Sequence, residues 1–384
     1  MLRFLPLNDR SLALDACRGV AVLAVIAYHL REFGFYPSLS APFTIWPACG
    51  MFGVDLFYVL SGFFITQAIL RPPTWQPAAF LQARVTRIYP AYLFSLLIVI
   101  IAKIGEGAVV EQNLIINTLL HVTMLHNFLG IGGSLNGVYW TLGVEFPYYL
   151  LMLALAPFLR NSRTFWLISL TMVGISVLWR VGVFLYIPGE INRVHPGTQL
   201  PSALDAFALG GVAAMLNRTA GLTQTLRRWR WPLFTIGITG LAFSLHYFSK
   251  HAGNYWSDEW SVMFWRSGFA ACCSLLVLAC AKMNQSKALA YSSLPWFGKI
   301  SFSLYLYHLL PILAINHYLA DQAWPLKLLL VTISTLLISW ASWRFVETRF
   351  HLNRMLIEHQ IDGLRCAHHE AQVSSPTYRR NHIK

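Results

Sequence analysis

Apolar segments long enough to cross a lipid bilayer recur along almost the whole chain. An α-helix needs about 20 apolar residues to span the hydrocarbon core of a membrane. Segments close to that length cover residues 12–31, 51–70, 90–106, 138–159, 164–187, 202–217, 232–249, 261–282, 299–320 and 325–346. The chain is 56% hydrophobic and only 12% charged, whereas soluble domains contain about 25% charged residues. The sequence therefore predicts an all-α membrane protein, a polytopic bundle of about ten transmembrane helices.

The stretch at residues 113–129 is less apolar than these ten segments. It is interrupted by Asn113, Asn117, His121, His126 and Asn127. Polar backbone and side chains are tolerated at membrane depth only where protein or water surrounds them. We interpret this stretch as a re-entrant or interfacial segment.

Basic residues give an independent test of the number of spans, because cytoplasmic loops of membrane proteins are enriched in Lys and Arg. With ten spans and a cytoplasmic N-terminus, the cytoplasmic segments contain Arg3, Arg10, Arg71, Arg84, Arg87, Arg160, Arg163, Arg218, Arg227, Arg228, Arg230, Lys282, Lys287, Lys299 and the basic tail. The outer segments contain Arg31, Lys103, Arg193, Lys250 and Lys327. An eleventh span would reverse every later loop, so ten spans with both termini in the cytoplasm agree best with the charges.

The placement of the charges also limits the function. The formal net charge of +13 does not indicate nucleic-acid binding, because the basic residues fall in short loops and in the tail. The six cysteines and the tail histidines lack the spacing of metal ligands, so we expect no metal. We divide the chain into a transmembrane domain at residues 9–350 and a basic, disordered cytoplasmic tail at residues 351–384.

The first span carries two ionisable residues, Arg18 and His29. Eleven helical residues make about three turns, so both side chains lie on one face, about 16 Å apart along the helix axis. Ionisable residues at membrane depth are costly and usually functional. The alternatives are an arginine that reaches the lipid head groups and a histidine that only packs.

Other spans add carboxylates and hydroxyls. Asp55 and Ser61 lie in the second span, and a buried carboxylate such as Asp55 needs a partner. Glu145 lies in the fourth span, at a depth that allows contact with His29, and could orient that imidazole or exchange a proton with it. In the ninth span Tyr305 and His308 share a helical stripe with Ser301, as expected of side chains that line a cavity.

Arg84 and Arg87 precede the third span, three residues apart and therefore on one helix face. Guanidinium groups are always charged and bind phosphate oxygens with paired hydrogen bonds. The pair could hold a phosphorylated ligand at the cytoplasmic surface. The alternative is an anchor for anionic lipid head groups.

Several of these motifs occur together in one order. They are the Arg18 and His29 spacing, GVDLFYVLSGFFIT, ARVTRIYPAYL, VYWTLGVE, ISFSLYLYH and WRFVETRF. This set resembles the membrane-bound acyltransferase family 3, which includes O-antigen, peptidoglycan and exopolysaccharide O-acetylases, over residues 9–350. The resemblance implies a bacterial inner-membrane enzyme that moves an acyl group from acyl-CoA, usually acetyl-CoA, to a hydroxyl of a saccharide or glycolipid. Some relatives carry a further domain after the bundle, and we expect none here.

Carried over by position, the resemblance makes Arg18, His29 and Glu145 the catalytic residues. It makes Arg84 and Arg87, with Arg18, the residues that bind acyl-CoA. We expect His29, oriented by Glu145, to act as a general base or as a transient acyl carrier.

In this interpretation the cavity is lined by Asp55, Ser61, Tyr305 and His308. The acceptor, the acyl chain, the side of transfer and the oligomeric state stay open. A proton-coupled transporter is the alternative function, because intramembrane His, Glu and Arg also mark ion pathways.

Overall fold

The described part of the chain is almost entirely helical. The computed structural model describes residues 11–35, 49–105, 112–129, 134–251, 255–283 and 287–350, and no β-strand occurs in these ranges. The α-helices are α1 (Leu12–Glu32), α3 (Gly53–Leu70), α4 (Pro77–Gly105), α5 (Gln112–Val122), α6 (His126–Leu129), α7 (Leu142–Leu159), α8 (Ser162–Tyr186), α9 (Glu190–Gly197), α10 (Leu200–Arg218), α11 (Thr223–His251), α12 (Arg266–Ala281), α13 (Lys287–Tyr291), α14 (Leu294–Lys299), α15 (Ser301–Tyr307), α16 (Leu309–Tyr318) and α17 (Trp324–Ser342). Short 3-10 turns cover Gly50–Phe52, Tyr139–Thr141 and Ala220–Leu222, and π-helical turns cover Ser261–Trp265 and Trp343–Glu347. The all-α prediction is confirmed.

Eight helical segments among the described residues are long and apolar enough to cross a membrane, as judged by length and composition. They are Leu12–Glu32, Gly50–Leu70, Pro77–Gly105, Tyr139–Leu159, Ser162–Tyr186, Leu200–Arg218, Ser261–Ala281 and Trp324–Phe350. Each of them overlaps one of the ten predicted spans. The chain is therefore a polytopic helical membrane protein, as its apolar pattern predicts.

The other two predicted spans are also helical but differ from the eight. The span at 232–249 lies within α11, which has 29 residues but is less apolar, because polar residues such as Ser244 and His246 interrupt it. The span at 299–320 is divided at His308, where α15 ends and α16 begins. A broken helix is tolerated at membrane depth where protein surrounds it, and His308 is completely buried.

The stretch at 113–129 does not form a spanning helix. It contains α5 with 11 residues and α6 with four, and a helix of either length is too short to cross a bilayer.

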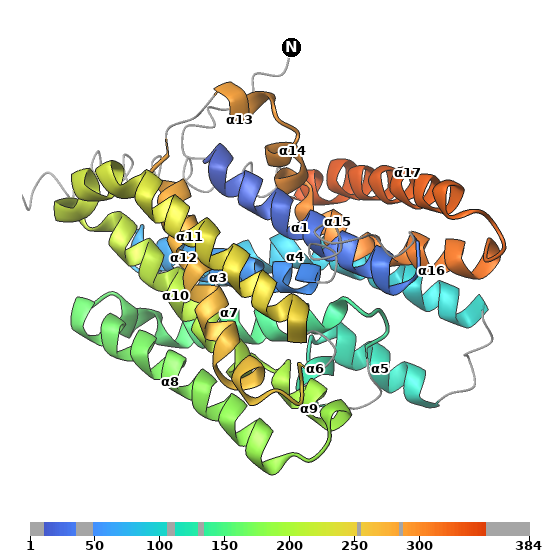
Figure 1. Cartoon of the computed structure of the whole chain (residues 1–384), viewed down its shortest axis with the longest axis horizontal. Coiled ribbons are helices and arrows are strands. Elements are labelled where there is room, and N and C mark those ends of the chain that lie inside the picture. Colours follow the sequence, from blue (N-terminus) through green and yellow to red (C-terminus); the bar gives the residue numbers. More distant parts are fainter. Residues whose placement is uncertain are drawn as a thin grey trace, which may run out of the picture.

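Helix α3 is the centre of the bundle and packs against α10, α1 and α12. In Figure 1, α8 forms one edge of the bundle. Helix α17 lies at the other edge, beyond α1 as seen from α8. Glycines allow the closest of these contacts. A Cβ atom added to Gly62 would lie 2.0 Å from the carbonyl oxygen of Phe207, and one added to Gly210 would lie 1.9 Å from that of Val59. Small residues thus let the α3 and α10 backbones touch, as in other membrane helix pairs.

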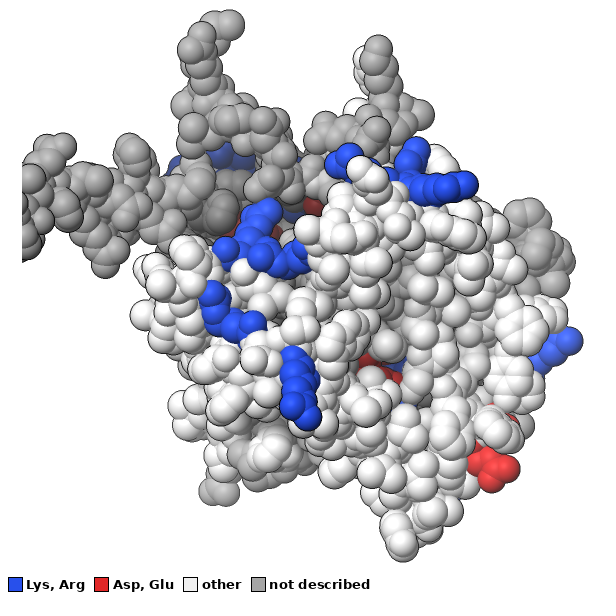
Figure 2. All heavy atoms as spheres, turned by 90° about the vertical axis from the view of Figure 1, so that its left-hand side faces the viewer, with Lys and Arg blue, Asp and Glu red and all other residues white. Residues whose placement is uncertain are grey.

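Two basic side chains join helix ends that the charge pattern assigns to the cytoplasm. Arg160, after α7, donates hydrogen bonds to the carbonyl oxygens of Ile69 and Pro73, next to the end of α3. Lys282, after α12, donates to the carbonyl oxygen of Asn217 near the end of α10. Figure 2 looks onto the left-hand side of Figure 1, where several Lys and Arg groups stand on a largely uncharged surface.

Candidate functional site

His29 lies in the last turn of α1 and contacts His308, at the break between α15 and α16. The Nδ1 atom of His29 is 3.0 Å from Nε2 of His308 and 3.0 Å from the carbonyl oxygen of Val25. The two imidazole centroids are 5.0 Å apart. The structure thus brings together two residues, 279 positions apart, that sequence analysis placed in separate roles.

The partners of the two histidines determine which nitrogen carries a proton. Nδ1 of His308 lies 3.0 Å and 2.9 Å from the carbonyl oxygens of Leu304 and Tyr305, so it must donate. In neutral His308 the other nitrogen, Nε2, then accepts, and Nδ1 of His29 donates to it and to Val25. This assignment leaves the lone pair of His29 on Nε2. No described residue hydrogen-bonds to that atom.

His29 borders a cavity of about 310 Å³, which we call the histidine cavity. Its other lining residues include Asp55, Arg266 and six large aromatic side chains, Tyr28, Phe52, Trp140, Tyr255, Trp256 and Tyr305. A cavity with apolar walls and a few fixed polar groups is typical of a small-molecule site. The prediction that His308 lines a cavity differs from the structure, in which His308 is fully buried behind His29 and does not border this cavity.

Asp55 has the partner that sequence analysis required but did not name. Its Oδ1 atom lies 2.6 Å from Nε of Arg266, and both side chains are less than 10% exposed. Arg266 also donates to the carbonyl oxygen of Gly197 at 3.2 Å. The signal was present in the sequence, because an intramembrane carboxylate and an intramembrane arginine must each find a counter-charge.

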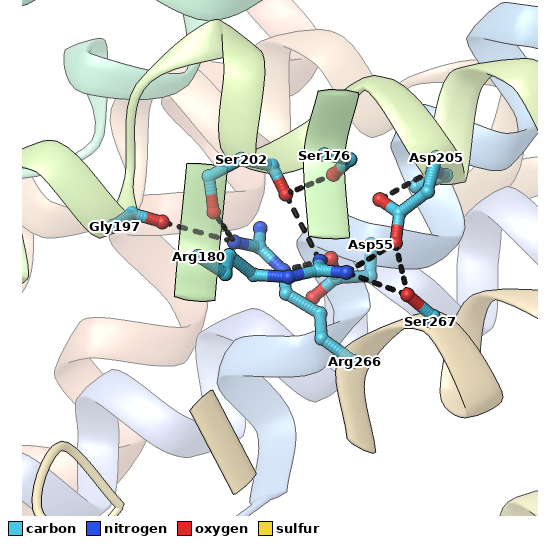
Figure 3. A network of polar contacts seen from close by, with 9 residues as sticks. Asp55, Ser176, Arg180, Gly197, Ser202, Asp205, Arg266 and Ser267 are labelled. Atoms are coloured by element: carbon cyan, nitrogen blue, oxygen red, sulfur yellow. Dashed lines mark hydrogen bonds and ion pairs between the residues drawn. The ribbon is translucent and has the colours of Figure 1, made fainter. Parts of the chain in front are cut away.

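A second buried ion pair is connected to the first by hydrogen bonds through Ser202 (Figure 3). Arg180 of α8 lies 2.8 Å from Asp205 of α10, and Ser267 of α12 hydrogen-bonds to both. Arg180 also donates to the carbonyl oxygen of Ser202, whose hydroxyl lies 3.5 Å from Arg266. This network links three helices behind the histidine cavity and fixes the direction of Arg266.

The predicted phosphate-binding arginines line a different cavity. Arg18, Arg84 and Arg87 all border a space of about 80 Å³, which we call the arginine cavity. Arg18 lies 3.0 Å from Asp15 and stacks over the ring of Phe64 at 4.2 Å. The structure therefore combines guanidinium groups from α1 and α4 at one site.

Glu145 and Ser61 also line the arginine cavity, and the expected contact between Glu145 and His29 is not formed. The Glu145 carboxylate accepts a hydrogen bond from the Ser61 hydroxyl at 2.5 Å and another from Tyr149. Depth along a span does not give the rotation of a helix, and α7 turns Glu145 toward α3 rather than toward the end of α1. The side chain that hydrogen-bonds to the His29 ring is that of His308.

Tyr305 and Val54 are the two residues that line both cavities. Tyr305 accepts a hydrogen bond from Thr141 at 2.8 Å and donates one to the carbonyl oxygen of Val138 at 3.1 Å. The polar stripe that contains Tyr305 predicts a cavity wall, but only the packing of the helices shows that Tyr305 lines two cavities.

Buried histidines hold the segment that carries Val138 and Thr141. The rings of His121 and His126 stack with centroids 4.0 Å apart, and Nε2 of His126 lies 2.9 Å from the carbonyl oxygen of Tyr139. Burial and, to a smaller extent, the neighbouring His126 together lower the pKa of His121 to about 4. The neutral ring of His121 accepts a hydrogen bond from the backbone N–H of Leu135.

Within the described ranges, no group of three or more His, Cys, Asp or Glu side chains could hold a metal ion. The histidines of the predicted 351–384 tail lie outside those ranges.

Comparison with known proteins gives a consistent result. A family model described as "Acyltransferase domain" (Acyl_transf_3) matches residues 11–344. The chain is 27% identical over 378 residues to "O-acetyltransferase OatA" of Staphylococcus aureus (strain NCTC 8325 / PS 47), covering 90% of this chain and 57% of the relative. It is 26% identical over 371 residues to "Peptidoglycan O-acetyltransferase OatA" of Listeria monocytogenes, covering 89% of this chain and 56% of the relative.

This chain thus spans little more than half the length of these curated relatives. No solved structure matches it significantly. The family match covers nearly all the described helices and both cavities. The chain therefore belongs to the acyltransferase 3 family, as the resemblance in its motifs implies.

Proposed function

We propose that this protein transfers an acyl group, acetyl in the simplest case, from acyl-CoA to a hydroxyl of a saccharide or glycolipid. The observation that carries the proposal is the pair of cavities that meet at Tyr305. One is lined by three arginines and the other by a histidine whose Nε2 lone pair has no hydrogen-bond partner among the described residues. The first suits a phosphorylated donor and the second suits a hydroxyl acceptor.

Acyl-CoA is the donor in this proposal, and the arginine cavity binds it. Arg84 and Arg87 hold the phosphates of CoA, because guanidinium groups bind phosphate oxygens in paired hydrogen bonds. Arg18 lines the same cavity and, in this proposal, guides the pantetheine arm toward Tyr305. The charge pattern supports a cytoplasmic opening, with both termini in the cytoplasm. The bacterial relatives support a bundle in the bacterial inner (cytoplasmic) membrane.

His29 acts as the general base in the reaction. Its Nε2 atom takes the proton from the acceptor hydroxyl, and the hydroxyl oxygen forms a bond to the thioester carbonyl carbon. The carbon–sulfur bond then breaks, and the CoA thiolate takes the proton from His29. The products are the acylated acceptor and CoA, so neither a cofactor nor a covalent intermediate is required.

The acceptor is a saccharide in this proposal, and it occupies the histidine cavity. Trp140 and Trp256 offer flat apolar surfaces for a sugar ring, while Asp55 and Arg266 offer hydrogen-bonding groups. The relatives named as O-acetyltransferases of peptidoglycan support a saccharide acceptor.

Incubation of the purified protein with radiolabelled acetyl-CoA and a saccharide mixture tests the proposal. We expect label on the saccharide and release of CoA with the wild type, and neither with His29→Ala. His246→Ala is the matched control, because His246 is an exposed histidine of α11. Equal transfer by His29→Ala and the wild type would refute the role of His29. Absence of acetyl-CoA binding by the wild type would refute the donor.

A further inference from the structure

Tyr305 lies where the two cavities share lining residues. Tyr305 is only 7% exposed, yet it borders the arginine cavity and the histidine cavity alike. We propose that Tyr305 controls the passage of the acyl group between the two cavities and thereby sets the length of acyl chain that the enzyme accepts. This inference rests on the proposed function, because it assumes a donor on one side and an acceptor on the other.

Hydrogen bonds hold the tyrosine ring in this position. The hydroxyl receives a hydrogen bond from Thr141 and donates one to Val138, both in the segment before α7. On its other side the ring makes an edge contact with Phe57 of α3, with centroids 6.1 Å apart. The barrier is therefore a positioned aromatic ring with partners on two other elements.

Tyr305 is also joined directly to the histidine pair. Its backbone carbonyl accepts a hydrogen bond from Nδ1 of His308, which in turn contacts His29. Because Tyr305 and Val54 line both cavities, an acyl carbonyl that moves from the arginine cavity to His29 passes beside the Tyr305 ring in this proposal. A longer acyl chain would have to fill the space beside this ring, which is bounded by Phe57 and Val54.

The size of the ring then determines specificity by a steric mechanism. A close-packed wall resists added methylene groups, and each unaccommodated methylene changes selectivity by about 10- to 200-fold. The wild type should favour a short acyl group. Tyr305→Ala should admit longer ones, while Tyr305→Phe should retain the wild-type selectivity because its ring has nearly the same size.

The test compares acetyl-CoA, butyryl-CoA and hexanoyl-CoA as donors for the wild type, Tyr305→Ala, Tyr305→Phe and Thr141→Val. We expect the ratio of kcat/KM for hexanoyl-CoA to that for acetyl-CoA to rise at least about tenfold in Tyr305→Ala. The ratio should stay within about twofold in Tyr305→Phe. Thr141→Val, which removes one hydrogen bond but leaves the ring in place, should likewise keep the ratio within about twofold of the wild type.

An unchanged ratio in Tyr305→Ala would overturn the inference while leaving the proposed function intact. If the wild type neither binds nor cleaves any of the three donors, the proposed function itself fails. Gel filtration in detergent shows whether Tyr305→Ala is folded. If it is not, Tyr305→Leu replaces it, and an unchanged ratio in that variant likewise counts against the inference.

Discussion

Nε2 of His308 lies 3.0 Å from Nδ1 of His29, so a histidine buried at a helix break holds the histidine at the edge of a cavity. In many hydrolases a carboxylate has this orienting position. A neutral imidazole at this position fixes the tautomer and direction of the His29 ring without adding a negative charge. The two rings join α1 to the junction of α15 and α16, so in the proposed mechanism the reactivity of His29 depends on that junction.

Replacing His308 should reduce turnover more than donor binding. We expect His308→Ala to lower kcat by about 10- to 100-fold, the usual effect of losing a residue that orients a functional histidine. The KM for acyl-CoA should change little, because His308 lies outside the arginine cavity. Steady-state kinetics with acetyl-CoA checks this split. A large rise in KM with unchanged kcat would contradict the orienting role.

Replacing Glu145 should act on the donor side. Glu145 contacts Ser61 and Tyr149 in the arginine cavity and does not touch His29. Glu145→Gln should therefore raise the KM for acyl-CoA by about tenfold. The kcat at saturating donor should fall by a smaller factor. Ser61→Ala is the companion variant, since it removes one of the two hydrogen bonds. If Glu145→Gln instead lowers kcat as much as His308→Ala does, Glu145 takes part in proton transfer after all.

Removing the arginine pair should weaken donor binding. Charge-assisted hydrogen bonds contribute about 1.5–3 kcal/mol each, so Arg84→Ala with Arg87→Ala should raise the Kd for CoA by at least about tenfold. The difference should shrink at high salt, because ions screen charges near the surface. Arg163→Ala is the control, as Arg163 is exposed and does not line either cavity. Calorimetric titration with CoA in detergent measures both effects. If the double variant and the wild type have equal Kd values for CoA, Arg84 and Arg87 do not bind the donor and act instead as an anchor for lipid head groups.

Breaking the buried ion pair should destabilise the bundle. Asp55→Ala leaves the Arg266 charge buried without its counter-ion, which costs about 3–5 kcal/mol in proteins. Arg31 and Glu32 form an exposed pair, with side chains 45% and 47% exposed, and Glu32→Ala should cost less than about 1 kcal/mol. Thermal unfolding in detergent compares the two variants. Similar losses would show that burial does not decide the strength of these pairs.

The contact between α3 and α10 should not tolerate a methyl group. Gly62→Ala or Gly210→Ala forces a Cβ atom against a backbone carbonyl, so we expect a loss of about 1–3 kcal/mol or more. Gly174→Ala in α8 should be neutral or slightly stabilising, because nothing lies within 4 Å of the added atom. Midpoints of thermal unfolding for the three variants check this order. A neutral effect at Gly62 would show that the two helices can separate without cost.

The sequence by itself determined the features that depend on local order. Apolar runs located the helices, since a bilayer admits only segments that satisfy their own backbone. The helical period placed Arg84 beside Arg87, and both do line one cavity. The intramembrane position of Asp55 marked it as a residue with a partner nearby, because an unpaired charge is costly in lipid, and the same cost marked Arg18 and Glu145 as functional candidates.

The identity of those partners was decided only by the tertiary structure. His29 and His308 are 279 positions apart, and Asp55 and Arg266 are 211 apart. Whether two such side chains meet depends on which helices pack together, how each is rotated and where α15 breaks. Depth along a span does not report rotation, so Glu145 was expected at His29 and lies instead at Ser61. The division of the interior into two cavities at Tyr305 follows from the same packing, which no local pattern encodes.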